Sequence, residues 1–169
     1  EGARIPPASL ADRLETLAGA DLVAFREGGR FVVRRAGGEL RFRRGDGIAD
    51  RRGNRWDVAG DAELLHPAVY PNALERLEGA LTCPTAGDVI VSAAPGWEFA
   101  DSGGTHHLGG GSHGSLRAED SLVPLVTAGF AAPPRLPDEP SITDLAPLIR
   151  GHFGAGAVSR PKALAAPVG

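Results

Sequence analysis

The sequence predicts an α/β fold, in which helices and strands pack around shared hydrophobic layers, and three observations support this prediction. Hydrophobic residues make up 42% of the 169 residues, a typical share for a globular protein. Apolar residues recur with helical spacing at residues 10–18 and 72–82, and β-prone runs lie between and after these segments. The 24 glycines and 14 prolines mostly fall at the ends of these runs, where turns are expected. Alternating helices and apolar strands are typical of a layered α/β architecture.

The first 62 residues are expected to form a helix and a small three-stranded β-meander. Helical spacing of leucines at residues 10–18 predicts an amphipathic helix that packs on a sheet. Strands are predicted at 22–26, 30–35 and 39–43, because Gly28-Gly29 and Gly37-Gly38 are two-residue hairpin signals between β-prone runs. Residues 45–61 carry many charges, so we expect them to form a surface excursion that Trp56 and Val58 pin to the body.

The net charge of −3 conceals a basic segment. Residues 26–55 hold ten arginines and four acidic residues, a net charge of +6, whereas residues 56–169 carry −7. A basic β-ribbon can contact nucleic-acid phosphates. However, few aromatic side chains accompany these arginines, which argues against base stacking. We therefore expect a solvated face whose charges protect a strand edge, and no nucleic-acid partner.

The second half is expected to contribute a helix, three strands and a further helix. A helix is predicted at 72–82, followed by an apolar strand at 88–93 that should be buried on both faces. A short partner strand is expected at 97–100 and another strand at 122–128, so that residues 87–130 form one sheet unit with a loop between them. Residues 131–140 form a proline-rich connector. Ser141 with Asp144 predicts a capped helix start, and the helix that follows is expected to bury three apolar residues, namely Leu145, Leu148 and Ile149.

The loop between the strands predicted at 97–100 and 122–128 contains most of the histidines of the chain. Three of the five histidines, His106, His107 and His113, lie among six glycines within residues 103–114. Imidazole is the commonest protein ligand for a divalent metal, so a metal site is one interpretation; exposed polar loop residues are the other. His66, beside Pro67, is interpreted as a structural or surface histidine.

Two other motifs in this loop do not lead to a function. Residues 109–114 match G-x-G-x-x-G, but no strand precedes the match and no helix follows it, so a dinucleotide site is not predicted. A Ser-His-Asp triad could be written with Ser112 or Ser115, His113, and Asp101 or Asp120. Residues so close in one loop rarely face one another, and triads depend on geometry.

At His113-Gly114-Ser115, followed by Asp120 and Val123-Pro124-Leu125, the sequence resembles the C-terminal end of an alkaline-phosphatase-superfamily hydrolase of the type I phosphodiesterase and nucleotide pyrophosphatase branch. Residues 87–93 and 96–99 resemble the strands that precede this loop, and the resemblance covers about residues 67–153. It implies that His113, and only His113, is a zinc ligand. His106, His107 and Asp120 are expected in the second shell or near the substrate, where Asp120 would orient the loop or its histidine.

The same resemblance implies a partial alkaline-phosphatase-like α/β sandwich. Residues 63–153 would form the C-terminal part of the catalytic domain, residues 1–62 an inserted or cap-like subdomain, and residues 154–169 a flexible tail. Two divalent metal ions, expected to be zinc, would bind in the full-length protein, with none expected in this chain alone. The implied partners are the N-terminal remainder of the same polypeptide and a small phosphoric-ester substrate.

The family's nucleophile and aspartate motifs are not found in this chain, so no catalytic residue is assigned to it. The chain begins at Glu1 and contains no methionine, and we expect it to be a C-terminal fragment without hydrolytic activity of its own. The alternative is a non-catalytic binding or structural module. The single cysteine, Cys83, excludes an intramolecular disulfide, and no apolar run is long enough for a membrane span.

Overall fold

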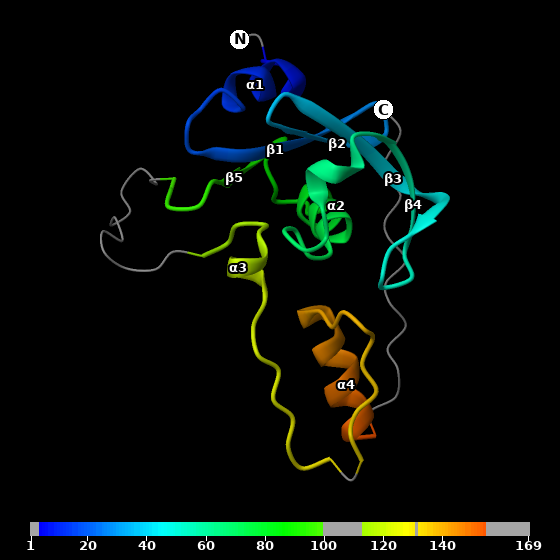
Figure 1. Ribbon diagram of the computed structural model, residues 1–169. Helices are drawn as coiled ribbons and strands as arrows, with labels where there is room; N and C mark the ends of the chain where they lie inside the picture. The colour runs from blue at the N-terminus through cyan, green and yellow to red at the C-terminus, as the bar shows by residue number, and fades with distance from the viewer. Residues whose placement is uncertain (1–3, 100–112, 131, 155–169) are drawn as a thin grey trace. The chain divides into compact units, whose positions relative to one another are not determined.

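The computed structural model describes residues 4–99, 113–130 and 132–154. The chain forms two compact units, Glu1–Pro124 and Leu125–Gly169. The predicted α/β class is confirmed in its general form, because helices accompany a five-stranded sheet (Figure 1). All strand pairs of this sheet are antiparallel.

The strand order of the sheet is β4-β3-β2-β1-β5. The predicted three-stranded meander is present as consecutive hairpins, and β5 pairs with the outer side of β1. The strands span β1 Ala20–Glu27, β2 Arg30–Arg35, β3 Gly38–Ala49, β4 Arg55–Gly60 and β5 Val89–Ala93.

The first two hairpin turns have left-handed backbone at both central residues. Gly28 and Gly29, at φ 56° and 73°, connect β1 to β2 as predicted. The second turn was predicted at Gly37-Gly38 but lies one residue earlier, at Ala36 and Gly37, with φ 50° and 79°. Gly38 instead pairs with Arg35 as the first residue of β3. The sequence pattern missed this shift because an alanine seldom adopts positive φ.

The prediction of a surface excursion at residues 45–61 is wrong. β3 continues to Ala49, and the chain returns as a fourth strand, β4. The register shifts between Arg44 and Ile48, which indicates a bulge in β3. Trp56 is fully buried, as its expected anchoring role requires. Trp56 and Val58 are two residues apart, as side chains on one face of a strand are, but the many charged residues around them led to the prediction of a surface segment.

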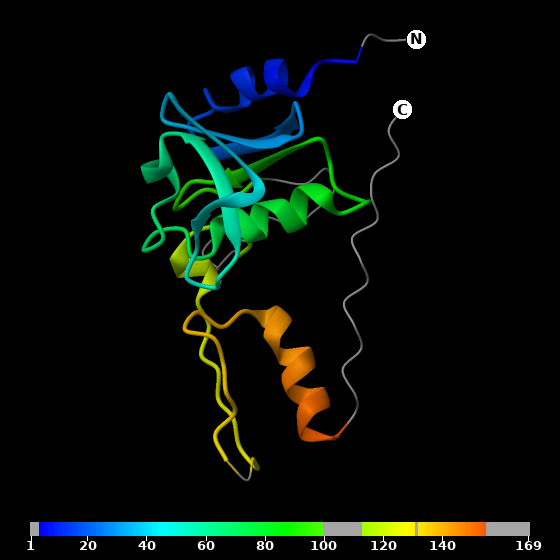
Figure 2. The same ribbon diagram turned by 90° about the vertical axis from the view of Figure 1, so that its right-hand side faces the viewer.

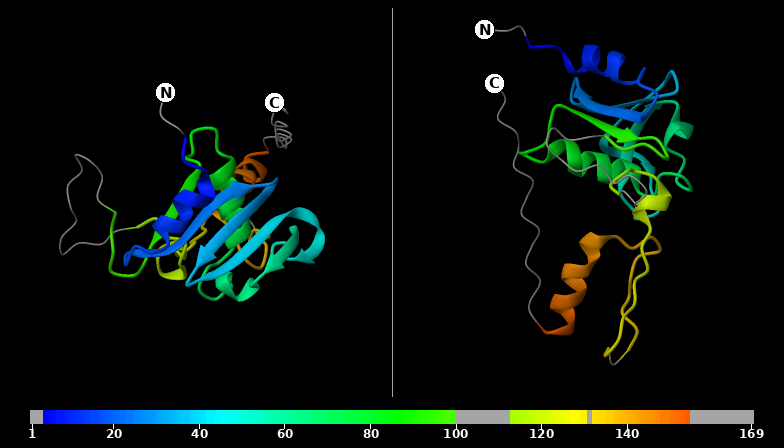
Figure 3. Two further views of the ribbon diagram at one scale, coloured as in Figure 1. Left: turned by 90° about the horizontal axis from the view of Figure 1, so that it is seen from above. Right: turned by 90° about the vertical axis from the view of Figure 1, so that its left-hand side faces the viewer.

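Two helices pack on opposite faces of the sheet (Figure 2). Helix α1, Pro7–Leu14, starts three residues before the predicted Leu10 with proline at its first position, which favours helix initiation. It contacts β1 and β5, and the view from above shows β3 and β4 away from it (Figure 3, left). Helix α2, Ala73–Thr82, agrees with the prediction.

The alternation of side chains along β1 explains the two cores. Leu22 and Ala24 face α2, whereas Val23 and Phe25 face α1, so β1 is buried on both sides. The smaller core lies under α1 and contains Ala11, Val23, Phe25 and Val32. The larger core lies between the sheet, the 3-10 helix η1 (Ala62–Leu65) and α2, and contains Leu22, Ala24, Val33, Leu40, Phe42, Trp56, Leu64, Leu65, Tyr70, Ala73, Leu77, Leu81 and Leu116.

The predicted sheet unit at residues 87–130 is wrong in three respects. β5 is at the edge of the sheet and is mostly half-buried, so β1 holds the doubly buried place expected for it. Residues 97–99 and 122–128 are not strands. Val123 and Val126 are 79% and 87% exposed. An apolar run predicts burial but does not specify what covers it.

The expected boundary at residues 62 and 63 lies inside the first unit, since β5 pairs with β1 and α2 contacts β1 and β2. In the second unit, the 3-10 helix η2 (Ile142–Asp144) leads into α4, Leu145–His152. The predicted helix start is confirmed by a capping box, in which the Asp144 carboxylate accepts the Ser141 N–H at 2.7 Å.

The predicted buried face of α4 is wrong in part, because α4 contains no buried residue and Ile149 is 54% exposed. Within the ranges that the structure describes, no helix is long and apolar enough to cross a lipid bilayer.

Candidate functional site

The expected metal ligand, His113, begins a described segment that leads into the larger core. His113 and Gly114 are exposed, Ser115 is half-buried and Leu116 is buried. We call residues 113–117 the His113 turn. Gly114 has φ 101°, a left-handed conformation that favours glycine. His106 and His107 lie outside the described residues, so their expected roles remain predictions.

The structure brings Asp120 to the His113 turn. Asp120 belongs to the short helix α3, Ala118–Ser121, and its Oδ2 accepts the Ser115 N–H at 3.3 Å. Its expected role as a residue that orients the loop is compatible with this contact. Ala118 continues the anchoring, since its N–H donates to the Val69 carbonyl at 2.7 Å.

Side chains satisfy every backbone polar group of Ser115 and Leu116. The Leu116 N–H donates to Ser92 Oγ at 3.2 Å, and Ser92 is itself buried in β5. The two carbonyls accept from Arg76: Nη2 lies 3.2 Å from the Ser115 oxygen and Nη1 lies 2.8 Å from the Leu116 oxygen. With Asp120 on the Ser115 N–H and Ser121 Oγ also donating to the Ser115 oxygen at 3.4 Å, four side chains perform the pairing that a helix or a strand would otherwise provide.

Arg76 is unusual among the arginines of the described chain. It projects from α2, is half-buried, and also donates from Nη1 to the Pro71 carbonyl at 3.2 Å. Burial lowers the pKa of its guanidinium. Among the described residues no carboxylate pairs with Arg76, and its hydrogen bonds go to backbone carbonyls.

A polar cluster continues from the C-terminal end of the turn. The Asp21 carboxylate, only 6% exposed, accepts from Tyr70 Oη at 2.8 Å and from Arg35 Nε at 3.1 Å. Arg117 Nη1 lies 3.4 Å from Tyr70 Oη and 3.7 Å from Asp21 Oδ2. Burial and the hydrogen bond to Asp21 raise the pKa of Tyr70, so its hydroxyl stays protonated and continues to donate. The cluster holds the turn against β1.

The arginine-rich strands form ion pairs with carboxylates. On the face that carries α1, Arg34 pairs with Glu39 and Asp12, Arg41 pairs with Glu39 and Glu27, and Arg43 pairs with Asp57. These contacts neutralise the face locally. A nucleic-acid phosphate would have to displace these carboxylates, which weakens the electrostatic argument for such a partner. The arginines with such ion pairs in the described chain include Arg34, Arg35, Arg41, Arg43, Arg44 and Arg52.

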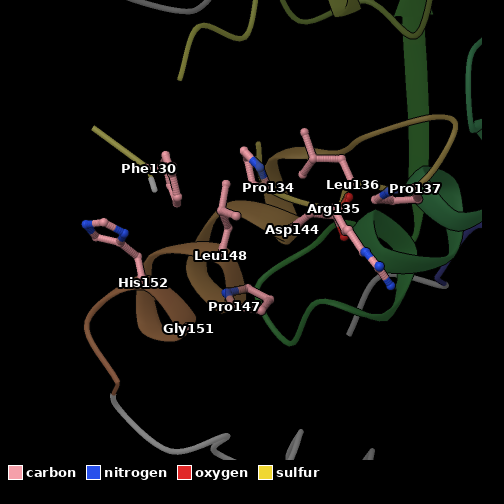
Figure 4. Close-up of a pocket in the computed structure, with 10 residues that line it drawn as sticks. All are labelled: Phe130, Pro134, Arg135, Leu136, Pro137, Asp144, Pro147, Leu148, Gly151 and His152. Carbon is pink, nitrogen blue, oxygen red and sulfur yellow. The ribbon is translucent and has the colours of Figure 1, made fainter. Parts of the chain in front are cut away.

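The second unit contains a groove of about 510 Å³ between its proline-rich connector and α4 (Figure 4). The rings of Phe130 and His152 lie against each other at one end, with centroids 4.6 Å apart and planes tilted by 57°, and Arg135 and Asp144 lie toward the other end. Prolines and Leu148 line most of the space between them. The polar groups do not converge on one point, as they would in a typical small-molecule site, so we do not place the candidate site here.

Metal-ligating groups do not cluster in the described part of the chain: no set of three or more His, Cys, Asp or Glu side chains is arranged to hold an ion there. Of the three loop histidines predicted as possible ligands, His113 alone lies within the described residues, so the described part of that loop offers one imidazole. Comparison of the chain with protein-family models, with curated proteins and with solved structures finds no match.

Two residues of this site, Arg76 and Ser92, were not expected from the sequence. Arg76 lies in a helix whose charged residues indicate an exposed face, so nothing marked it as an anchor. Ser92 did give a signal, because it is the one polar residue in the apolar run at 89–93. A polar side chain on a buried face normally requires a hydrogen-bond partner.

Proposed function

We propose that this chain is the C-terminal part of a metal-dependent phosphoric-ester hydrolase, similar to the type I phosphodiesterases and nucleotide pyrophosphatases, and that His113 supplies one metal ligand. The observation that carries the proposal is the run His113-Gly114-Ser115 with Asp120 and Val123-Pro124-Leu125 at the family's spacing. The expected alkaline-phosphatase-like sandwich belongs to this proposal and concerns the full-length protein.

The anchored backbone of the His113 turn supports a ligand role. The imidazole is exposed, whereas the two residues after Gly114 are held by side chains from α2, β5 and α3. A metal ligand has to be presented from a backbone that does not move when the ion binds, and outer residues usually provide that support. The backbone of the His113 turn is held by neighbouring side chains in this way.

Among the described residues, the His113 imidazole could supply one of the ligands of a zinc ion. A catalytic zinc ion takes three protein ligands, so other residues of the full-length protein would complete each site. When bound, two zinc ions would supply positive charge that stabilises the phosphoryl oxygens and the leaving group of a small phosphoric ester. The role of this chain would be to hold one imidazole in place. The chain alone is expected to hydrolyse no phosphoric ester.

The test is His113→Ala in the full-length protein, with the zinc content measured by elemental analysis and the activity measured on nitrophenyl phosphate and its diesters. We expect loss of the zinc bound at one site and of most turnover, because an incomplete ligand set no longer fixes the metal's geometry. His66→Ala is the control, since His66 Nδ1 accepts the Ala68 N–H at 3.2 Å and serves a local turn. If His113→Ala retains both zinc and activity, the proposal fails.

A non-catalytic interaction module is the second candidate, and one observation favours it. Several large apolar side chains of the second unit are exposed among its described residues, including Leu125, Val126, Ile142, Ile149 and Phe153. Exposed apolar groups of this kind often mark an interaction surface. The two candidates differ in metal content, because only the hydrolase requires zinc to be lost with His113.

A further inference from the structure

We infer that β5 is the edge through which two copies of this chain associate, the two β5 strands pairing antiparallel about Val91 so that their five-stranded sheets join into one. This inference goes beyond the proposed function and requires no metal ion. The evidence is the hydrogen-bonding pattern of β5, the side chains that β5 carries, and the contrast with β4 at the other edge of the sheet.

The turn between β1 and β2 shows which backbone groups of β1 bond to β5. In a two-residue hairpin, the residues that flank the turn form a hydrogen-bonded pair, and here they are Glu27 and Arg30. Bonding groups alternate along an antiparallel strand. The odd-numbered residues 23, 25 and 27 of β1 therefore bond to β2, and the even-numbered residues 22 and 24 bond to β5.

The same alternation shows which groups of β5 point away from the sheet. Residues 22 and 24 of β1 lie opposite Ser92 and Ile90, so these two residues of β5 bond to β1. Ala94 continues the alternation, because its N–H donates to the Gly19 carbonyl at 2.8 Å. The residues between them direct their N–H and C=O groups to the outer side of β5; they are Val89, Val91 and Ala93. Among the described residues, no strand and no other backbone group pairs with that side (Figure 3, right).

These outward groups are symmetric about Val91. In an antiparallel copy centred there, Val91 lies opposite its own counterpart and Val89 lies opposite Ala93 of the second copy, so each outward N–H meets an outward carbonyl. Asp88, which precedes the strand and pairs with Arg4, would lie opposite an alanine, so no like charges face each other. Such a pair uses the same surface of both copies and closes as a dimer.

The side chains of β5 also favour a second strand beside it. Val89 and Val91 pack at the border of the smaller core under α1, and Ile90 packs at the border of the larger core. Apart from the buried Ser92, the residues of β5 are only half-buried, because β1 covers one side of the strand. A second β5 would cover more of the two valines and extend the smaller core across the dimer axis.

The opposite edge of the sheet has features that prevent strand pairing, and β5 lacks them. β4 contains the charged residues Arg55 and Asp57 and lies beside the bulge of β3. β5 contains no charged residue and no proline, and its register with β1 is regular from Val89 to Ser92. Natural proteins protect or cover an edge of this kind. The symmetry of the outward groups fits a second copy of the same strand.

The experiment measures the oligomeric state of the 169-residue chain by sedimentation velocity at about 1 μM to 1 mM, where weak dimers dissociate. Val91→Pro removes an outward N–H and leaves the bonds between β5 and β1 in place, and proline is tolerated at such edge positions. Val91→Ala is the matched control, because it shortens the same side chain and keeps the N–H. Hydrogen exchange of the amides of residues 89, 91 and 93 reports pairing at the edge, and circular dichroism reports folding.

We expect a monomer–dimer equilibrium in which these three amides exchange slowly in the dimer only. Val91→Pro should weaken dimerisation about 10–100-fold, because the symmetric pair loses both bonds donated by residue 91. Val91→Ala should stay closer to the wild type. A chain that is monomeric at every concentration, or that forms open-ended assemblies, would overturn the inference. Slow exchange of these amides in a monomer would also overturn it, since another part of the same chain would then cover β5.

The variants separate pairing at β5 from association through another surface. If folded Val91→Pro dimerises like the wild type, or if both variants lose affinity equally, the backbone of β5 does not form the interface and the inference is wrong. Should Val91→Pro not fold, Val89→Pro decides the question, because proline is compatible with the first residue of a strand. Wild-type affinity in that folded variant would contradict the inference. The zinc content of His113→Ala tests the proposed function separately.

Discussion

The arginines of the strands and Arg76 of α2 use the same side chain in opposite ways. Arg34, Arg41 and Arg43 lie on a partly exposed sheet face and pair with carboxylates. Arg76 is half-buried and donates to backbone carbonyls of a segment that is neither helix nor strand. The strand arginines neutralise charge on a surface, whereas Arg76 holds the backbone of a chain segment in place.

This difference has an energetic consequence. Exposed ion pairs contribute about 0–1 kcal/mol each, because water already solvates both partners and salt screens them. A hydrogen bond that satisfies a buried backbone group is costlier to lose, about 1–3 kcal/mol, because the group left behind has no water. The many strand arginines should therefore matter less individually than the few side chains that hold the His113 turn.

The largest of the following effects is expected for Ser92→Ala. This change removes the acceptor of the buried Leu116 N–H and should lower the free energy of unfolding by about 1–2 kcal/mol. Urea unfolding and hydrogen exchange of the Leu116 amide measure it. Ser121→Ala is the control: its hydroxyl donates to the carbonyls of Ser115 and Arg117 in a less buried place, so a smaller loss is expected. Equal losses would contradict the comparison.

A smaller, pH-dependent effect is expected at Glu39. The hydrogen bond from Arg41 lowers the pKa of the Glu39 carboxyl, partial burial opposes this, and the bond from Arg34 adds to the lowering. Because the folded pKa lies below the unfolded value of about 4.3, the contribution is complete above that value and is lost as the pH falls through the folded pKa.

Glu39→Gln should therefore flatten this part of the acid dependence. Urea midpoints from pH 7 down to pH 3 test the effect, with Glu15→Gln at the exposed end of α1 as the control. The difference in stability between wild type and Glu39→Gln should shrink at acid pH. A difference that is constant over the whole range would show that the ion pairs do not carry it.

The smallest effect is expected for the Arg43–Asp57 pair, whose N–O distance is 3.1 Å. Asp57 also accepts the Gly47 N–H at 3.2 Å, so removing Asp57 alone should cost more than removing Arg43 alone. A double-mutant cycle with Arg43→Met and Asp57→Ala isolates the pair. We expect a coupling of about 0.2–1 kcal/mol that declines at high salt. A larger coupling that does not decline at high salt would show that this pair behaves like the buried hydrogen bonds and not like an exposed ion pair.

The sequence predicted the elements whose signals are local. The Gly28-Gly29 turn, helix α2 and the capping box at Ser141 and Asp144 follow from backbone and capping preferences of neighbouring residues. The expected metal ligand, His113, came from a family resemblance and stays a prediction. The exposed run at 122–128 was wrongly expected to be a strand, because hydrophobicity alone does not specify a partner.

By itself the sequence determined the mixed α/β class, the meander and the concentration of arginines at residues 26–55, since each depends on short-range pattern or composition. Only the tertiary structure decided that β1, and not β5, is buried on both faces, and that carboxylates as distant as Asp12 and Asp57 neutralise the arginines. It also brought Arg76 to Ser115, 39 residues away. The physical reason is that hydrogen bonds and ion pairs act over a few ångströms in space, whereas sequence patterns report only what lies nearby along the chain.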